Sequence, residues 1–134
     1  MIYKIKDIFG KEICVQPVVK LYDVKNFLGK KTLGLNISLN ELDENGEFIG
    51  QYCTLTLSFG EFIGMKNAVY IDTNNCPFAE QFLTDNNIAT PTGLTKLSGF
   101  CRYPLWLLNE DFLIQHGKDA YGKYVDAYNA EIEF

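Results

Sequence analysis

The sequence predicts an α+β fold, with an antiparallel sheet of about five to six strands, one central helix and short C-terminal helices packed on the sheet. Three observations support this class. Residues 33–39 and 49–59 alternate apolar and polar side chains with the period of two that a half-buried strand has. Residues 69–71 are β-branched or aromatic and lead through turn formers into helical spacing from Pro77. From residue 110 onward, residues that mark helix ends and apolar residues at helical spacing occur again.

The composition indicates a folded chain of one domain, residues 1–134. Of its 134 residues, 47% are hydrophobic and 14% aromatic, which is enough to bury a core without metal or disulfide. The first 31 residues hold seven lysines against three acidic residues, whereas the remainder carries 14 acidic residues against five basic ones. An acidic body disfavours binding to phosphate backbones and attracts a basic protein surface. We therefore expect a basic protein partner and no direct DNA binding.

The sequence has no sign of export or of membrane insertion. Residues 1–7 carry charges at every second or third position, and no apolar stretch follows them as in a signal peptide. No run approaches the length of a transmembrane helix. The four cysteines are widely separated and form no Cys-x-x-Cys pair, which is typical of reduced thiols in a cytoplasmic protein. We expect a cytoplasmic protein that uses no cofactor.

The N-terminal part is expected to form hairpins. Two strands within residues 1–24 are joined near residues 9–11. The basic stretch that follows, residues 25–31, is interpreted as a solvated loop rather than a binding patch. Its apolar side chains, Phe27 and Leu28, are expected to fold back onto the core.

The turn of the next hairpin sets the register of its two strands. A two-residue Asn-Gly loop would place the apolar face of one strand against the polar face of the other. A three-residue loop, residues 44–46 with Gly46 left-handed, instead pairs Ile37 with Cys53. The tip is then a solvated acidic knob that contains Asp43, Glu44 and Glu47.

The C-terminal half is expected to alternate helix, loop and strand. A helix runs from Pro77 to about residues 86–87, because proline at the first helical position leaves no N–H unpaired. Residues 88–99, rich in Thr, Pro and Gly, are predicted to form a loop. Residues 100–108 resume as a strand that Pro104 interrupts.

Two further helices are expected near the C-terminus. Asn109 is predicted to be the N-cap of the first, which is followed by acidic residues in the first turn. Gly117 is expected to be the C′ residue, and a second helix starts at Asp119. His116, the only histidine, lies where a helix terminus favours a cation, so we expect a structural role rather than a general base.

The sequence contains no recognisable catalytic motif. There is no nucleophile elbow, no phosphate-binding loop and no second histidine, and we assign no catalytic residue. Oxygen donors gather around the end of the strand at residues 69–71, and such donors could hold Mg²⁺ or Ca²⁺. Asx residues at a strand–helix junction more often bind backbone N–H groups, so we assign no metal. These donors are Asp72, Asn74, Asn75 and Glu80.

One block of the sequence is similar to a known family. Residues 71–82, then 91–93 and 98–105, resemble a family of small uncharacterised domains encoded on bacterial plasmids and conjugative elements. That family typically shows Asp-Thr-Asn-Asn-x-Pro-aromatic-Ala-Glu, then Thr-Gly, then Ser-Gly-aromatic-Cys-x-Tyr-Pro-Leu. The resemblance covers about residues 48–108.

The resemblance implies a biological setting and supplies no catalytic residue. Proteins similar to this one travel on mobile elements as anti-defence factors, and some small acidic proteins of that neighbourhood look like anti-CRISPR inhibitors of Cas9. RNA-guided nucleases hold nucleic acid in basic channels, which an acidic domain can occupy. We expect a non-enzymatic inhibitor that binds Cas9 or the Cas9–guide RNA complex. Its expected partner-binding residues are Asp43, Glu44, Glu47, Asp72, Asn74 and Asn75.

Two alternatives to this function stay open. The first is a ribonuclease that acts on the guide RNA through Asp72 and neighbouring groups. The second is an interaction module of the mobile element that binds a relaxase or regulator and inhibits no nuclease. Sensitivity to metal chelation would favour the first, and capture of the partner from cells that hold the element would favour the second.

Overall fold

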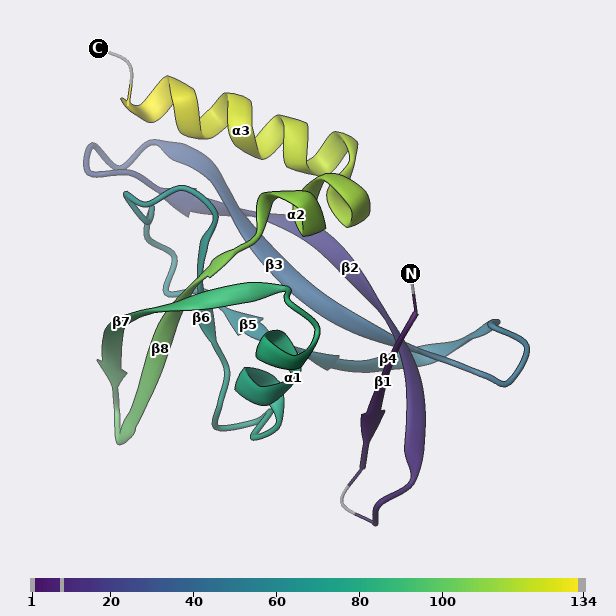
Figure 1. Cartoon of the computed structure of the whole chain (residues 1–134). Coiled ribbons are helices and arrows are strands. Elements are labelled where there is room, and N and C mark those ends of the chain that lie inside the picture. The colour runs from purple at the N-terminus through teal and green to yellow at the C-terminus, as the bar shows by residue number, and fades with distance from the viewer. Residues whose placement is uncertain (1, 8, 133–134) are drawn as a thin grey trace.

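The described part of the chain folds into two antiparallel sheets and three helices, so the predicted α+β class is confirmed (Figure 1). The computed structural model describes residues 2–7 and 9–132. The strands of this part form two four-stranded sheets rather than the single sheet that was predicted. The first sheet, in the order of its neighbours, consists of β1 (Tyr3–Lys6), β2 (Glu12–Lys25), β3 (Lys31–Leu42) and β4 (Phe48–Thr54).

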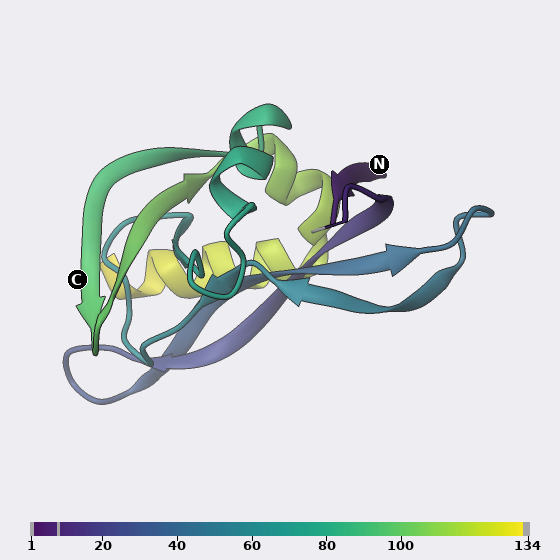
Figure 2. The same cartoon turned by 90° about the horizontal axis from the view of Figure 1, so that it is seen from below.

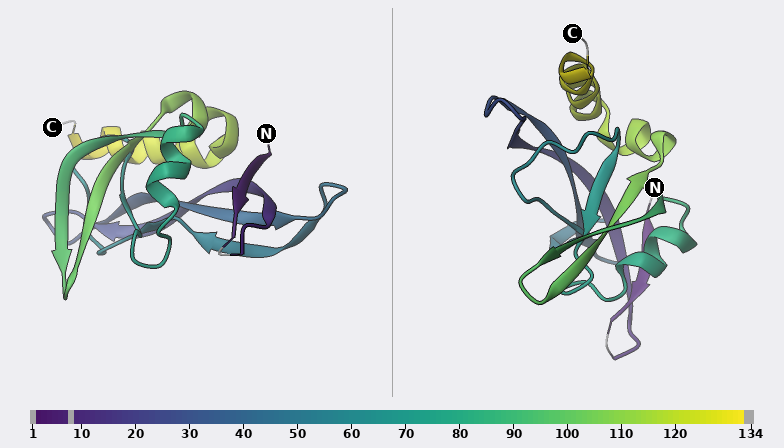
Figure 3. Two further views of the ribbon diagram at one scale, coloured as in Figure 1. Left: turned by 60° about the horizontal axis from the view of Figure 1, so that its bottom comes forward. Right: turned by 90° about the vertical axis from the view of Figure 1, so that its left-hand side faces the viewer.

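The second sheet and the helices come from the rest of the chain. The order of this sheet is β5 (Thr56–Leu57), β6 (Ala68–Ile71), β8 (Cys101–Leu108) and β7 (Ala89–Ser98). The helices are α1 (Ala79–Asp85), α2 (Glu110–Gly117) and α3 (Asp119–Ile132). Helices α2 and α3 lie across the long strands β2 and β3, which Figure 3 shows from two further sides.

The three hairpin turns of the first sheet share one local design. In each turn an Asx side chain accepts the backbone N–H groups of the residues two and four positions later. A glycine three positions after the Asx residue has a positive φ, a conformation that costs glycine little. The predicted three-residue turn with a left-handed glycine is therefore confirmed. The Asx residues are Asp7, Asn26 and Asp43, and the glycines are Gly10, Gly29 and Gly46.

The register of β3 and β4 differs from the prediction by two residues. Cys53 lies opposite Leu39 and not opposite Ile37. The cause is two β-bulges, at which Ile49 and Tyr52 of β4 have no partner in β3. Because the two extra residues together restore the period of two, Cys53 still faces the same side of the sheet as predicted.

The two sheets are joined at Leu55, which lies between β4 and β5 and is 0% exposed. Its N–H donates to the carbonyl of Ile37 at 2.8 Å, and its carbonyl accepts the N–H of Asp72 at 2.8 Å. Beyond this point, the Thr56 hydroxyl accepts the Ile37 N–H at 3.0 Å in place of a backbone carbonyl. The predicted continuous strand over residues 49–59 is therefore divided between the two sheets.

The predicted loop at residues 88–99 is wrong, because most of it forms the edge strand β7. An edge strand tolerates proline and glycine, since one row of its backbone groups needs no partner. The pairing with β8 is irregular between Pro91 and Thr95. Pro104 does not interrupt β8 and lies opposite Thr95.

The helix positions are close to the prediction, with differences at two ends. Helix α1 begins at Ala79, because Pro77 lies in a turn that precedes it. The expected left-handed residue after α2 is Lys118, with φ 47°, and Gly117 is the last helical residue. Glycine is required there for space, since a Cβ atom would lie 2.9 Å from the Cβ of Tyr121.

One core connects both sheets and the helices. Two residues predicted to join it do not: the side chains of Phe27 and Leu28 are 97% and 79% exposed. They lie in the β2–β3 turn. This turn is at one end of the two long strands, at the end of the sheet (Figure 1). The buried side chains include Val15, Leu35, Ile37, Leu39, Val69, Ile71, Trp106, Phe112, Leu113 and Tyr124.

We predict that Leu55→Ala lowers the free energy of unfolding by about 2 to 5 kcal/mol, because it leaves a cavity where the sheets meet. Leu97→Ala is the matched control, since Leu97 is 61% exposed and its loss should cost less than about 0.5 kcal/mol. Urea unfolding followed by circular dichroism measures both values. Equal destabilisation by the two substitutions would contradict this description of the junction.

Candidate functional site

The six residues expected to bind a partner lie at two separate places. Figures 1 and 2 show the β3–β4 hairpin reaching away from the body, whereas the turn between β6 and α1 lies on the body itself. The hairpin tip holds Asp43, Glu44 and Glu47, and the turn holds Asp72, Asn74 and Asn75. The structure therefore provides two surfaces rather than one continuous acidic face.

At the hairpin tip, one carboxylate builds the turn and two are available to a partner. Asp43 is half-buried, and its carboxylate accepts the N–H groups of Asn45 at 2.8 Å and of Glu47 at 2.9 Å. Glu44 and Glu47 are exposed, and neither forms an ion pair within the described residues. The acidic knob is thus present as predicted, but Asp43 is needed for its shape.

Exposed apolar side chains adjoin these carboxylates, which the charge pattern alone did not indicate. Phe48 and Ile49 are 65% and 58% exposed. Ile49 is one of the bulged residues, so it has no cross-strand neighbour in β3. A hollow of about 430 Å³ lies beside it, lined in part by Ile13 of β2 and Glu41 of β3. Apolar anchors surrounded by polar groups are the usual arrangement of a protein-binding surface.

The turn between β6 and α1 is held by its own side chains. The Asp72 carboxylate accepts the Asn75 backbone N–H at 3.2 Å and its side-chain amide at 2.9 Å. Glu80 points elsewhere, and its carboxylate accepts the indole N–H of Trp106 at 3.1 Å. Within residues 2–7 and 9–132, no group of three or more His, Cys, Asp or Glu residues could hold a metal ion. Asn74 and Asn75 are the exposed members of this turn.

The fold also brings together two cysteines that are distant in the sequence. Cys76 is buried, and its thiol donates to the carbonyl of Thr54 at 3.4 Å. A hydrogen bond with Cys76, together with burial, raises the pKa of Cys53 above its ordinary value. Cys53 is therefore protonated at neutral pH, which makes it a poor nucleophile.

His116 lies in the last turn of α2 as predicted, and its ring packs against aromatic side chains. Its ring packs 4.6 Å from that of Phe112 and 6.0 Å from that of Tyr3, measured between ring centroids. Burial lowers the pKa of His116 below the ordinary value of 6.5, so the imidazole is mainly neutral at pH 7. Its Nε2 atom is buried without a hydrogen-bond partner among the described residues.

These features define a two-sheet α+β protein with a projecting acidic hairpin. The chain belongs to the family described as Domain of unknown function (DUF4313), whose sequence profile matches residues 21–132. The match extends from β2 through α3 and leaves out β1. Membership of an uncharacterised domain family, which the resemblance implied, is confirmed. Comparisons with curated proteins and with solved structures each find no match.

The described part of the chain has three helices, α1, α2 and α3. None of them is long and apolar enough to cross a bilayer. The longest, α3, comprises 14 residues. A transmembrane helix needs about 20 predominantly apolar residues.

We predict that Asp43→Ala loosens the hairpin tip, whereas Asp43→Asn preserves it. Alanine removes the acceptor for two backbone N–H groups, while asparagine keeps it, as Asn26 does in the preceding hairpin. Hydrogen exchange followed by NMR should show faster exchange of the Asn45 and Glu47 amides only in the alanine variant. Unchanged exchange in that variant would show that the carboxylate does not hold the turn.

We predict that His116 titrates below pH 6.5 in the folded protein. The chain has a single histidine, so one imidazole proton signal in NMR reports its midpoint directly. Because the unfolded chain binds this proton more tightly, the contribution to stability is constant above about pH 6.5 and falls as the pH decreases below it. The variant His116→Gln should lose this part of the pH dependence. A midpoint at or above 6.5 would contradict the burial argument.

Proposed function

We propose that the chain is a non-enzymatic inhibitor, encoded on a bacterial mobile element, that binds a type II Cas9 or its complex with guide RNA in the bacterial cytoplasm. The observation that carries the proposal is the β3–β4 tip, where the carboxylates of Glu44 and Glu47 adjoin the exposed side chains of Phe48 and Ile49. The mobile-element origin comes from the resemblance of residues 48–108. Membership of the DUF4313 family names no activity, and the hairpin tip is the feature of the molecule that supports an inhibitor.

The chemistry of the tip suits a basic groove on a protein. Carboxylates steer the encounter with a basic channel, and a channel that holds nucleic acid is strongly basic. Charges at the rim of an interface add little affinity, whereas a buried aromatic anchor contributes much of it. In this arrangement Phe48 supplies contact energy, and Glu44 and Glu47 supply orientation and association rate.

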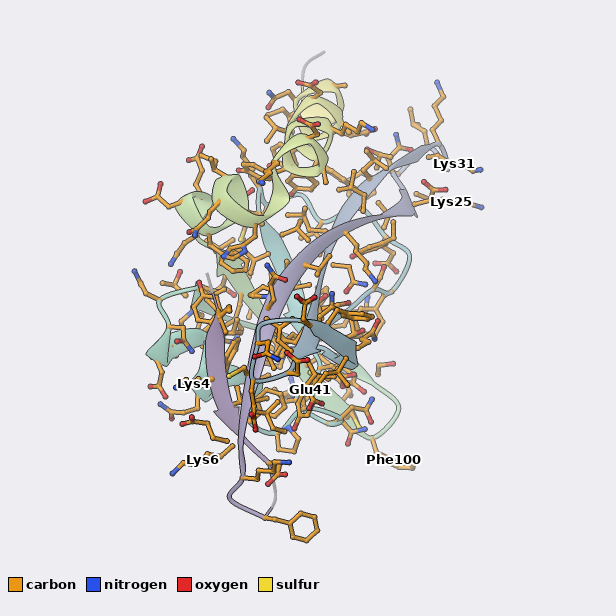
Figure 4. The ribbon with its side chains drawn as sticks, turned by 90° about the vertical axis from the view of Figure 1, so that its right-hand side faces the viewer. Lys4, Lys6, Lys25, Lys31, Glu41 and Phe100 are labelled. Atoms are coloured by element: carbon orange, nitrogen blue, oxygen red, sulfur yellow. The ribbon has the colours of Figure 1, made fainter. Side chains whose placement is uncertain are left out.

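The lysines of the N-terminal region do not form one nucleic-acid-binding patch. Figure 4 shows Lys4 and Lys6 at one end of the first sheet and Lys25 and Lys31 at the other. The chain as a whole carries a formal net charge of −5. Both facts favour a protein surface over a phosphate backbone as the partner.

The turn that holds Asp72, Asn74 and Asn75 is a second, separate candidate contact. This turn lies on the body of the protein, apart from the hairpin tip, so only a partner that extends from the tip to the body would contact both. The Asp72 carboxylate, by contrast, is engaged in holding the turn. The proposal therefore places the main contact at the hairpin tip.

Cleavage of target DNA by purified Cas9 and guide RNA tests the proposal. The protein is added before or after guide loading, and the guide is run on a denaturing gel. We expect inhibition with an intact guide, and the order of addition identifies the step that is blocked. A shortened guide would instead support the ribonuclease alternative. No inhibition across several Cas9 orthologues would overturn the proposal.

A matched pair of charge reversals tests the contact surface. We predict that Glu44→Lys with Glu47→Lys raises the concentration needed for half inhibition at least about tenfold. The control, Asp23→Lys with Asp126→Lys, makes the same charge change at exposed positions on β2 and α3 and should leave inhibition unchanged. Asp43 is left intact because it forms the turn. Equal loss in both variants would show that net charge, and not the tip, drives binding.

A further inference from the structure

The β2–β3 turn presents two apolar side chains to solvent from a hydrogen-bonded backbone. Phe27 and Leu28 lie at its tip, where both are exposed. The Asn26 side chain holds the turn, because its carbonyl oxygen accepts the N–H groups of Leu28 and Lys30, both at 2.9 Å. Its amide group donates to the Glu131 carboxylate of α3 at 2.9 Å. The two apolar side chains therefore project from the body instead of packing on it.

A second hairpin presents apolar side chains on the same side of the molecule. Phe100 lies at the tip of the β7–β8 hairpin and is fully exposed, and Leu97 of β7 is also exposed. Figures 1 and 2 show the tip of this hairpin and the β2–β3 turn on one side of the protein, whereas the β3–β4 tip reaches out on the opposite side. A single extended surface can therefore contact both apolar tips at once.

The charges on these two sides of the molecule have opposite signs. Residues 25–31 contain three lysines and residues 94–104 contain one lysine and one arginine, and neither segment contains an acidic residue. Residues 41–47, at the β3–β4 tip, contain four acidic residues and no basic one. Strand β3 connects the two sides and has 12 residues, so it is roughly 40 Å long. Although the chain has a net charge of −5, the side with the exposed Phe27 and Phe100 is therefore rich in cations.

Three acidic residues lie near the base of the β2–β3 turn and reduce its positive charge. Glu61 forms an ion pair with Lys96 at 3.3 Å, and Glu131 is hydrogen-bonded to the turn itself. Asp23 is exposed on β2. The lysines of residues 25–31 form no ion pair within the described part of the chain. Together with Lys96 they outnumber the three acidic residues, so the tip keeps a positive balance.

We propose that this side of the protein docks on the surface of an anionic lipid bilayer. The side chains of Phe27, Leu28 and Phe100 enter the headgroup region, while the lysines of residues 25–31 and Arg102 contact the anionic headgroups. Two convex apolar tips beside cations suit a soft surface, whereas a folded protein partner would need two separate pockets at a matching distance. The docking is peripheral and requires no membrane-spanning helix. It is independent of the nuclease proposal, since the β3–β4 tip points away from the bilayer in this arrangement (Figure 1).

Sedimentation of the full chain with lipid vesicles is the first test. The vesicles contain equal parts of phosphatidylglycerol and phosphatidylcholine, and the control vesicles contain phosphatidylcholine alone. We expect at least about tenfold tighter binding to the anionic vesicles at low salt, and weaker binding as the salt concentration rises. No binding to the anionic vesicles, or equal binding to both kinds, would overturn the proposal.

Serine substitutions test the apolar contact. Phe27→Ser with Leu28→Ser should weaken binding to the anionic vesicles at least about tenfold, because the tip loses the side chains that enter the bilayer. Phe9→Ser is the matched control. Phe9 is exposed in the β1–β2 turn, which has the same Asx design and lies at the other end of β2. The control should bind as the unmodified protein does, and equal weakening in both variants would overturn the proposal.

Charge reversals test the contact with the headgroups. Lys30→Glu with Lys31→Glu should also weaken binding at least about tenfold. The control, Lys6→Glu with Lys11→Glu, makes the same charge change near the β1–β2 turn, and Figure 4 shows Lys6 at the opposite end of the sheet from Lys31. The control should bind nearly as tightly as the unmodified protein. Equal loss in both variants would overturn the proposal, as would displacement from the vesicles by a single-stranded oligonucleotide, which would assign the lysines to nucleic acid.

A tryptophan at the tip distinguishes insertion from contact with headgroups alone. The natural tryptophan, Trp106, is buried and contributes the same background to every variant. The fluorescence of Phe27→Trp should shift to shorter wavelength when anionic vesicles are added, because the indole leaves water. The fluorescence of Phe9→Trp should not shift. No shift in Phe27→Trp, or the same shift in both variants, would overturn the proposal.

Discussion

The backbone of Leu55 is hydrogen-bonded on both sides of the junction between the two sheets, and most of the architecture depends on these two bonds. Its N–H group is bonded to the first sheet and its carbonyl to the chain at the end of the second sheet. Both groups are buried, so a displacement of either sheet would leave a backbone polar group without a partner or water. This constraint fixes where the β3–β4 hairpin leaves the body. It also fixes the turn at Asp72, which leads into α1.

The features that could be predicted from the sequence are those that short segments determine. The Asx and glycine residues that close the β3–β4 turn act within five residues, and the structure has the turn that they predict. The starts of α2 and α3 are likewise marked by local residues. The position of the acidic tip followed from the same turn chemistry, so that part of the candidate site was accessible without a structure.

The remaining features depend on residues that are distant in the chain. The division into two sheets requires the Thr56 hydroxyl to replace a backbone acceptor for Ile37, which no periodicity reveals. Strand β7 does not follow from its sequence, because the Thr, Pro and Gly residues that an edge strand tolerates are also typical of loops. The exposure of Phe48 and the partial burial of His116 are likewise set by tertiary packing.

The order of the elements along the chain has a consequence for synthesis on the ribosome. All strands of the first sheet are complete at Thr54, whereas the helices that cover its core face, α2 and α3, start at Glu110 and Asp119. During translation, the strands that form this apolar face are therefore synthesised well before helices α2 and α3, which cover it. Domains emerge from the ribosome at about 5 to 20 residues per second, so the uncovered sheet persists for several seconds. In that interval the nascent chain is the form most exposed to aggregation and most dependent on chaperones.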